Sequence, residues 1–447
     1  MPPAPPATRL PTLRSGLRPK VTLGSCDKAD CLILDANHRQ ALVVARSLGR
    51  AGLSVALAES SDEHALHAPI PAFSSAFSAG TTILPSMSRE PDGFAAAVLD
   101  LIERRPTTVV VPSTDASIAA LRPRRTLIEQ RSALALASEP ALDLANDKAR
   151  TLALAAQVGI RTPRSVTVEA PDQVVGALAE VGLPAVLKPT RSWVCAHDVG
   201  SRVVPRDVIN VAEVTAICAE IFGAGCPSVV VQEFVPGRRE ALCVFYAYGR
   251  SWAEFALVVH RTSPLLGGYA VVRESIPVPH DLTPAIGLLE AADLEGFSEI
   301  EFRRDASGRP VLMEINARLS GTIELPQRAG VDFPGYLFDW AVGAPLVPTT
   351  GYRTGVRLRY LYGDIQWLLE NLKRPGRPDS AGASRALAAF TAEFFRPGGY
   401  DYMDRGDLSP VVVATGRSVV GGARRLRVKA RSTIEGRRQA SSGLVRA

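Results

Sequence analysis

The chain has 447 residues, of which 46% are hydrophobic and 21% charged, so it is long enough for two or three globular domains. Its net charge of +6 comes from its two ends. Residues 1–20 carry four basic groups and no acid, residues 411–447 carry nine basic groups and one acid, and the body between them is therefore near −6. A folded nucleic-acid-binding protein carries its basic groups on the fold, so we expect no nucleic-acid partner. No apolar run approaches the roughly 20 residues that cross a bilayer, so we expect no transmembrane segment.

The two ends are predicted to be unstructured. Residues 1–30 begin with a Pro-rich, basic stretch that lacks the apolar core of a secretory signal, and we interpret them as a disordered basic arm. Residues 411–447 are interpreted as a solvated basic tail. None of the six cysteines forms a CxxC pair, and the histidines show no metal-site spacing. We expect a cytoplasmic protein with reduced thiols.

Alternating strands and helices are predicted for residues 31–143. "CLILDA" (31–36) is a short buried strand, residues 38–52 have helical periodicity, and "LSVALAES" (53–60) and residues 106–115 are further strands. This alternation is typical of a parallel sheet covered by helices. The turn after the first strand lacks a glycine fingerprint, which disfavours dinucleotide binding there. Asn37 and Asp115 follow strand ends, where such sheets bind ligands.

The middle of the chain contains two lysines in informative places. Residues 144–165 are predicted to hold a helix capped near Asn146 or Asp147 and ending at Gly159. "LPAVLKPT" (183–190) is predicted as a strand with Lys188 inside an apolar run. Burying this ammonium is costly without an anionic partner, although an edge position where it reaches water is the alternative. Residues 228–249 are predicted as strand, sharp "VPG" turn and strand.

Residues 299–321, "EIEFRRDASGRPVLMEINARLSG", are predicted to form a hairpin around the turn "DASG". With Ala306 to Arg309 as the loop, Asp305 would pair with Pro310 and Glu301 would lie opposite Glu314. Glu314 and Asn316 share a face, because side chains two apart on a strand point the same way. A solvated sheet face is the plain interpretation. Carboxylate and amide oxygens without His or Cys also suit Mg²⁺, which usually bridges to phosphates.

Together these segments resemble the ATP-grasp superfamily of carboxylate–amine ligases, with carbamoyl-phosphate-synthase-like members included, from about residue 31 to 345. "NDKART…GIRTP", "AVLKP", "VQEFVPGRRE" and "EIEF…LMEINAR" carry the resemblance through their order and spacing. It implies an α/β architecture, with an N-terminal parallel-sheet pre-ATP-grasp domain followed by a two-lobed α+β ATP-grasp domain. The expected divisions are 31–143, 144–345 with a lid subdomain at about 160–233, and a C-terminal extension at 346–410.

The resemblance also implies a set of site residues. The ATP-binding positions that it implies are Lys148, Lys188, Gln232, Glu233, Phe234, Val235 and Glu240. In this comparison the two lysines meet the phosphates, residues 232–235 line the adenine, and Glu240 accepts the ribose hydroxyls. Glu301, Glu314 and Asn316 match the family's ligands for Mg²⁺, which Mn²⁺ can replace, and Arg318 matches an arginine that faces the reacting group.

The substrates are less constrained. Gly267 and Gly268 permit close backbone approach, and Arg261 and Arg273 are candidates for binding a substrate carboxylate, with a surface role as the alternative. Residues 190–202 are not the Gly- and Ser-rich lid that is usual in the family. Glu299 stands where D-alanine–D-alanine ligases have an arginine, which argues against that substrate.

The resulting hypothesis is an ATP- and Mg²⁺-dependent ligase that activates an amino-acid-like carboxylate as an acyl phosphate, joins it to an amine, and releases ADP and phosphate. A bicarbonate-activating carboxylase or carbamoyl-type enzyme is one alternative, and a non-catalytic ATP-binding regulator is another. The expected partners are small-molecule carboxylates and amines, and a homodimer is compatible with the resemblance.

Overall fold

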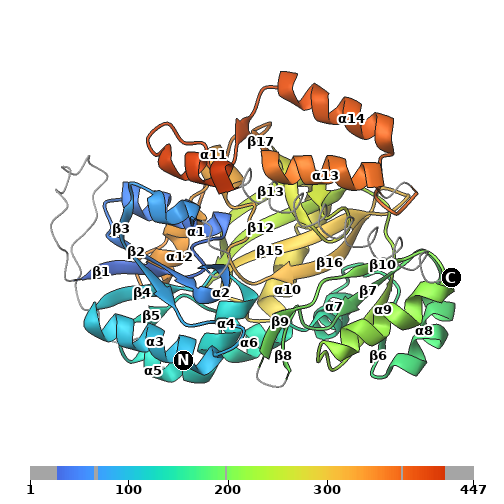
Figure 1. Ribbon diagram of the computed structural model, residues 1–447, viewed down its shortest axis with the longest axis horizontal. Helices are drawn as coiled ribbons and strands as arrows, with labels where there is room; N and C mark the ends of the chain where they lie inside the picture. The colour runs from blue at the N-terminus through green and yellow to red at the C-terminus, as the bar shows by residue number, and fades with distance from the viewer. Residues whose placement is uncertain (1–27, 65–68, 197–198, 374–375, 418–447) are drawn as a thin grey trace, which may run out of the picture.

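The computed structural model describes residues 28–64, 69–196, 199–373 and 376–417. The first 27 residues, most of the basic tail and His197 therefore lie outside the described residues. In the described part of the chain, no helix combines the length and apolar character that crossing a membrane requires. The N-terminal domain lies at one end of the molecule, the lid at the other, and a large sheet lies between them (Figure 1).

The N-terminal domain is a five-stranded parallel sheet of order β3-β2-β1-β4-β5. Its strands are β1 (Ala29–Ile33), β2 (Val55–Ser60), β3 (Ser78–Leu84), β4 (Thr107–Val111) and β5 (Ala133–Leu134). Its helices are α1 (Arg39–Arg50), α2 (Ser61–His64), α3 (Pro91–Arg104), α4 (Asp115–Leu121), α5 (Arg125–Glu129) and α6 (Glu139–Ala145). The predicted parallel α/β sheet is confirmed.

The lid is an antiparallel sheet of order β10-β7-β11-β6 with two helices on one face. Its elements are β6 (Ser165–Val168), α8 (Val174–Val181), β7 (Ala185–Pro189), β10 (Arg206–Val208), α9 (Val211–Gly223) and β11 (Val229–Glu233). A separate hairpin, β8 (Trp193–Ala196) and β9 (Val199–Arg202), replaces the expected lid loop. Alternate residues such as Leu187 and Val229 pack under the helices. Lys188 and Gln232 therefore project from the opposite face.

The central body is a seven-stranded sheet of order β16-β15-β12-β13-β14-β17-β18. Its strands are β12 (Arg239–Ala247), β13 (Arg250–Ser263), β14 (Tyr269–Ile276), β15 (Gly296–Arg304), β16 (Pro310–Asn316), β17 (Arg357–Arg359) and β18 (Gly399–Tyr400). Alternating apolar residues of β12 pack on opposite sides: Leu242 and Val244 belong to a core shared with α10 (Ala285–Ala291), and Phe245 to a core shared with α12 (Phe333–Ala341). The two-lobed α+β arrangement is confirmed. The "VPG" turn separates strands of two different sheets, because β11 belongs to the lid and β12 to the central sheet.

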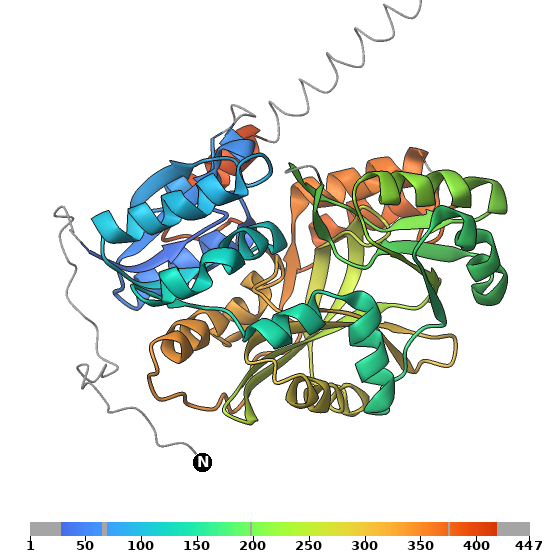
Figure 2. The ribbon, with the colours of Figure 1, turned by 90° about the horizontal axis from the view of Figure 1, so that it is seen from below.

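Four further helices complete the described part of the fold. α7 (Lys148–Gln157) contacts β16, and α11 (Glu324–Ala329) follows the hairpin. Two helices of the C-terminal extension, α13 (Leu361–Lys373) and α14 (Ala383–Ala392), lie on the same side of the central sheet, next to the lid (Figures 1 and 2). The exact domain boundaries stay predictions.

Asp401 links the N-terminal domain to the central sheet. The Asp401 carboxylate is almost fully buried between Arg39 of α1 and Arg273 of β14, with an Arg273 Nη2–Oδ1 distance of 2.7 Å. Burial opposes ionisation, but the two guanidinium groups lower the pKa of Asp401 below its usual value. The two domains are consequently joined by a charged contact that is shielded from water.

Candidate functional site

The β15–β16 hairpin brings Glu301 opposite Glu314, as predicted, but through a different register. Arg304, and not Asp305, pairs with Pro310. An extra residue in β16, Met313, forms a bulge that restores the Glu301–Glu314 pairing. Glu299 then lies opposite Asn316 on the same face.

The carboxylates on this face are compensated by cations. Arg239 of β12 donates to Glu301 Oε1 at 2.5 Å, and Asn316 Nδ2 donates to the same oxygen at 3.2 Å. Burial raises the pKa of Glu301 to about 7; Arg239 opposes this, and repulsion by Glu314 and Glu299 adds to it. Burial also acts on Glu314, but the nearby lysine and arginine charges lower its pKa below the usual value. Two buried carboxylates side by side favour a cation that neutralises both.

The two lysines approach this patch from different elements. Lys148 is the first residue of α7, whose N-cap is Asp147, and its Nζ donates to Ser192 Oγ at 2.8 Å. Lys188 is 9% exposed on the lid face that is turned to the central sheet. Burial lowers the pKa of Lys188 to about 8, against the attraction of Glu314 and with the repulsion of Lys148. The edge-position alternative for Lys188 is wrong, because its ammonium is buried among charges of the site.

The segment between the two sheets forms an apolar wall beside the charged patch. Val235 packs with Val311 and Met313. Gln232 is 1% exposed, and its Nε2 has no hydrogen-bond partner among the described residues. Gly237 passes so close to β15 that an added Cβ would lie 1.7 Å from Arg304 O. A flat polar ligand that accepts a hydrogen bond from Gln232 would fit this wall.

Residues 232–237 connect the lid sheet to the central sheet and are called the hinge below. The remaining side chains of this hinge have partners. Glu233 accepts from Arg164 Nε at 2.8 Å, and the Phe234 ring lies 5.1 Å from the Arg303 guanidinium carbon. The ribose contact expected of Glu240 stays a prediction. Glu240 pairs with Phe302 in the ladder and therefore faces away from Glu301, and its fully buried carboxylate accepts from Arg304 Nε at 2.9 Å. The neighbouring Arg239 instead lies on the face of Glu301, to which it donates.

Arg318 connects the patch to the N-terminal domain. Its Nε and Nη2 donate to Asp115 at 2.6 and 3.0 Å, and its Nη2 lies 3.4 Å from Asn316 Oδ1. Burial would raise the pKa of Asp115, yet the charge and hydrogen bonds of Arg318, with help from Lys148, lower it to about 2. Asp115, noted in the sequence only for its strand-end position, thus becomes part of the site.

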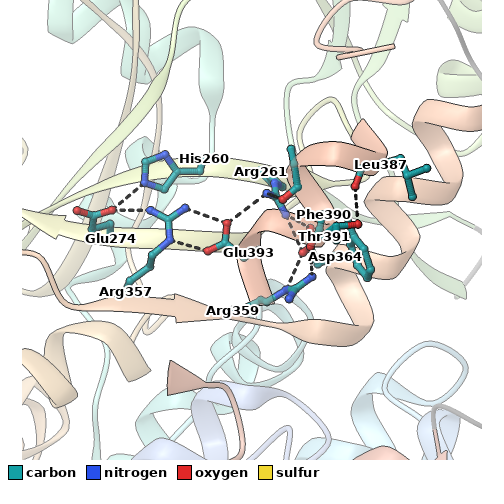
Figure 3. A network of polar contacts seen from close by, with 11 residues as sticks. His260, Arg261, Glu274, Arg357, Arg359, Asp364, Leu387, Phe390, Thr391 and Glu393 are labelled. Carbon is teal, nitrogen blue, oxygen red and sulfur yellow. Dashed lines mark hydrogen bonds and ion pairs between the residues drawn. The ribbon is translucent and has the colours of Figure 1, made fainter. Parts of the chain in front are cut away.

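The candidate substrate arginines are both bound by buried carboxylates. Arg261 donates to both oxygens of Asp364 at 2.9 and 2.8 Å and to Glu393, within a network that anchors the C-terminal helices (Figure 3). Arg273 is fully buried against Asp401. Their guanidinium groups are already bound by buried carboxylates, so the structure contradicts the expectation that they bind a substrate.

Two cavities flank the charged patch. One, of about 460 Å³, lies between the N-terminal domain, the central sheet and the β8–β9 hairpin; Gly267, Gly268, Glu299 and Glu301 are among its lining residues. The other, of about 470 Å³, lies beside the hinge and is lined by Gly237, Arg303 and Met313 among others. Glu301 borders both cavities, which places the charged patch between an open pocket and an apolar wall.

Three inward-facing residues were missed as site residues in the sequence: Arg239, Glu299 and Arg303. The sequence could have indicated two of them, because Glu299 and Arg303 lie two residues before and after Glu301 and therefore share its strand face. Among the described residues, no cluster of three or more His, Cys, Asp and Glu side chains is arranged as a metal site. Glu301, Glu314 and Asn316 supply two carboxylates and one amide, a set suited to Mg²⁺ that keeps water or phosphate ligands.

Comparison with known proteins gives one family match and many similar folds. Residues 250–363 match the family model "ATP-grasp in the biosynthetic pathway with Ter operon". A search of curated proteins by sequence found no match. Among solved structures, biotin carboxylase from Campylobacter jejuni, in complex with β,γ-ATP, is similar with a TM-score of 0.57 and 14% identity, over 75% of each chain.

Two further solved structures show the same likeness. N5-carboxyaminoimidazole ribonucleotide synthetase from Thermus thermophilus has a TM-score of 0.55 and 20% identity, over 77% of this chain and 87% of that one. L-amino acid ligase from Bacillus licheniformis has a TM-score of 0.52 and 14% identity, over 70% and 74%. At these identities the likeness establishes the fold.

Proposed function

We propose that the chain is an ATP-grasp enzyme, an ATP- and Mg²⁺-dependent ligase that activates a carboxylate as an acyl phosphate and joins it to an amine; the match of residues 250–363 to an ATP-grasp family model and the similar folds support this. One observation carries the proposal. Lys148, Lys188 and Arg318, from three different parts of the chain, converge on Glu314: Lys148 and Arg318 line one space with it, and the charges of all three cations lower its pKa. A triphosphate needs such convergent cations, and a metal needs the carboxylates.

The hinge supports the nucleotide half of this proposal. The unpartnered Nε2 of Gln232 and the apolar surface of Val235 and Met313 suit a purine base that accepts a hydrogen bond and stacks. In the proposed assignment, residues 232–235 hold the base, and Lys148 and Lys188 hold the phosphates.

Glu301, Glu314 and Asn316 are the proposed metal ligands. Mg²⁺ bound there would neutralise phosphate charge and orient the terminal phosphate. Arg239 competes for Glu301 in the metal-free protein, so metal binding requires this arginine to turn toward the phosphates. Arg318 is held by Asp115 at the border of the cavity of about 460 Å³, where it can orient the acid's carboxylate for attack on the terminal phosphate.

The acid and amine would lie in the cavity of about 460 Å³, where Gly267 and Gly268 keep the backbone wall flat. An added Cβ at Gly268 would lie 2.0 Å from Pro264 O, so this strand end accepts no side chain. Glu299 and Glu301 on the sheet and Glu59 and Asp62 on the N-terminal domain line the same space together with Arg39, Arg202, Arg239 and Arg318. Charges of both signs suit a substrate that carries both, such as an amino acid.

The experiment is a product assay with ¹⁸O-labelled acids. Acyl phosphate formation predicts ADP as the nucleotide product and transfer of one labelled carboxyl oxygen into inorganic phosphate. AMP with pyrophosphate would overturn the mechanism, and absence of any nucleotide turnover with a wide panel of acids and amines would favour a regulator.

Bicarbonate activation is the second candidate, because a biotin carboxylase has a similar fold. Bicarbonate-dependent ADP release without an added organic acid would select it over the ligase.

A further inference from the structure

The loop between α13 and α14 reaches the proposed nucleotide site from the C-terminal extension. The cavity beside the hinge, of about 470 Å³, is lined by Gly237 and Met313 and also by Trp367 of α13 and Asp379 of this loop. Residues about fifty and sixty positions after the hairpin therefore line the cavity beside the wall on which the base would lie.

Asp379 holds one inward-facing arginine in a fixed orientation. Arg303 donates through Nη1 and Nη2 to the two Asp379 oxygens at 2.8 and 2.6 Å, and through Nε to Gly237 O at 3.2 Å. Both side chains of the ion pair are more than four-fifths buried. The Arg303 guanidinium also lies against the Phe234 ring. A two-pronged contact of this kind determines the plane of the guanidinium as well as its position.

The same loop is fastened to the lid. Arg377 donates through Nη1 and Nη2 to Glu213 of α9 at 2.9 and 3.0 Å, and its Nη1 lies 3.4 Å from Asp207 of β10. Asp379 itself has φ = 63°, a conformation that side chains other than Gly, Asn and Asp rarely adopt. Asp379 thus occupies a turn conformation that suits an aspartate, and this part of the loop has one contact on the lid, through Arg377, and one on the central sheet, through Asp379.

We propose that Asp379 is a positioning residue of the nucleotide site, acting through Arg303 at the base end. This inference rests on the proposed function and extends it to the C-terminal extension. Arg303 lies two residues from Glu301 on the same face, and its guanidinium is a flat surface that a purine can stack upon. Without Asp379, the arginine is free to turn toward Glu301 and to leave the hinge.

The test is Mg·ADP binding to full-length Asp379→Asn, measured by calorimetry. Asparagine adopts positive φ as readily as aspartate, so the backbone is preserved while the charge is removed. We expect ADP affinity to fall by five- to fiftyfold. Affinity for Mg-tripolyphosphate, which has no base, should stay within twofold of wild type. Asp404→Asn, which breaks the exposed pair with Arg50, is the matched control and should bind both ligands normally.

A double mutant separates positioning from plain structural support. If Asp379 acts through Arg303, then Asp379→Asn should weaken ADP binding no further in an Arg303→Gln background. Additive losses, or ADP affinity in Asp379→Asn within twofold of wild type, would overturn the inference while leaving the proposed function intact. Failure of the wild-type protein to bind ADP would overturn both. Should Asp379→Asn not fold, Arg303→Gln alone must show the same selective loss of ADP over tripolyphosphate.

Discussion

Lys188 is expected to lower the free energy of unfolding of the protein. In the folded chain the pKa of this lysine falls from 10.5 to about 8, because burial outweighs the attraction of Glu314. Each pKa unit corresponds to about 1.36 kcal/mol, so keeping the ammonium charged costs the folded state about 3 kcal/mol at pH 7. Lys188→Met removes the charge at similar volume. The variant should therefore be more stable than wild type, by about 2–3 kcal/mol.

The pH dependence has a defined sign. Between pH 8 and 10.5 the unfolded chain retains the Lys188 proton and the folded chain has lost it, so wild-type stability rises with pH across this window. The advantage of Lys188→Met should consequently shrink from pH 8 upward and disappear near pH 10.5. Urea unfolding in EDTA without nucleotide, at pH 7 and at pH 9.5, measures both values.

Binding should change in the opposite direction. A lysine that contacts phosphate in a buried site is worth about 2–4 kcal/mol, so ADP affinity should fall by about 30- to 1000-fold. Exposed Lys373→Met is the control, expected to stay within about 0.5 kcal/mol of wild type in stability and to bind ADP normally. A Lys188→Met protein that is less stable than wild type at pH 7, or that binds ADP equally well, would refute the reasoning.

Three further variants test other contacts. Glu314→Gln should keep the fold and lose nucleotide turnover, because the amide retains volume but supplies no metal charge; normal turnover at saturating Mg²⁺ would remove Glu314 from the metal site. Asp401→Asn should lower the free energy of unfolding by about 3–5 kcal/mol, since Arg39 and Arg273 would stay buried without their carboxylate; thermal unfolding with a loss under 1 kcal/mol would contradict this. Gly237→Ala should weaken ADP binding at least tenfold, because its methyl group meets Arg304 O at 1.7 Å and must displace the hinge; calorimetry with unchanged affinity would show that the hinge yields freely.

The parts of the fold with strong local patterns were predictable. Short Val- and Leu-rich strands between amphipathic helices give the parallel sheet, and the order of the lysine, hinge and hairpin segments gives the two-lobed body. Ion pairs between residues far apart in the sequence were not predictable. Nothing local to Arg261 or Arg273 indicates that Asp364 and Asp401, more than a hundred residues later, would bind them.

Face assignments were predictable in part. Glu301, Glu314 and Asn316 were placed on one face correctly, although the pairing of Asp305 with Pro310 was wrong. Glu240 was assigned by its position in the motif alone, and its pairing with Phe302 places it on the strand face opposite to that of Glu301. A bulge has no reliable sequence signal, because it depends on which residues the neighbouring strand requires opposite them.

The extra residue at Met313 makes the hairpin tolerant of a change in length at one point. Deleting Met313 would remove the bulge and leave a regular ladder, in which Glu314 still lies opposite Glu301 and Asn316 opposite Glu299. Deleting two residues between Val311 and Glu314 would instead place Glu314 opposite Phe302, on the apolar side that holds Leu312 and Ile315. Insertions in the turn at 305–309 leave the face of Glu314 unchanged. Relatives of this chain should therefore vary in the length of the turn and in the presence of the residue at 313, and they should not lose two residues between the turn and the glutamate.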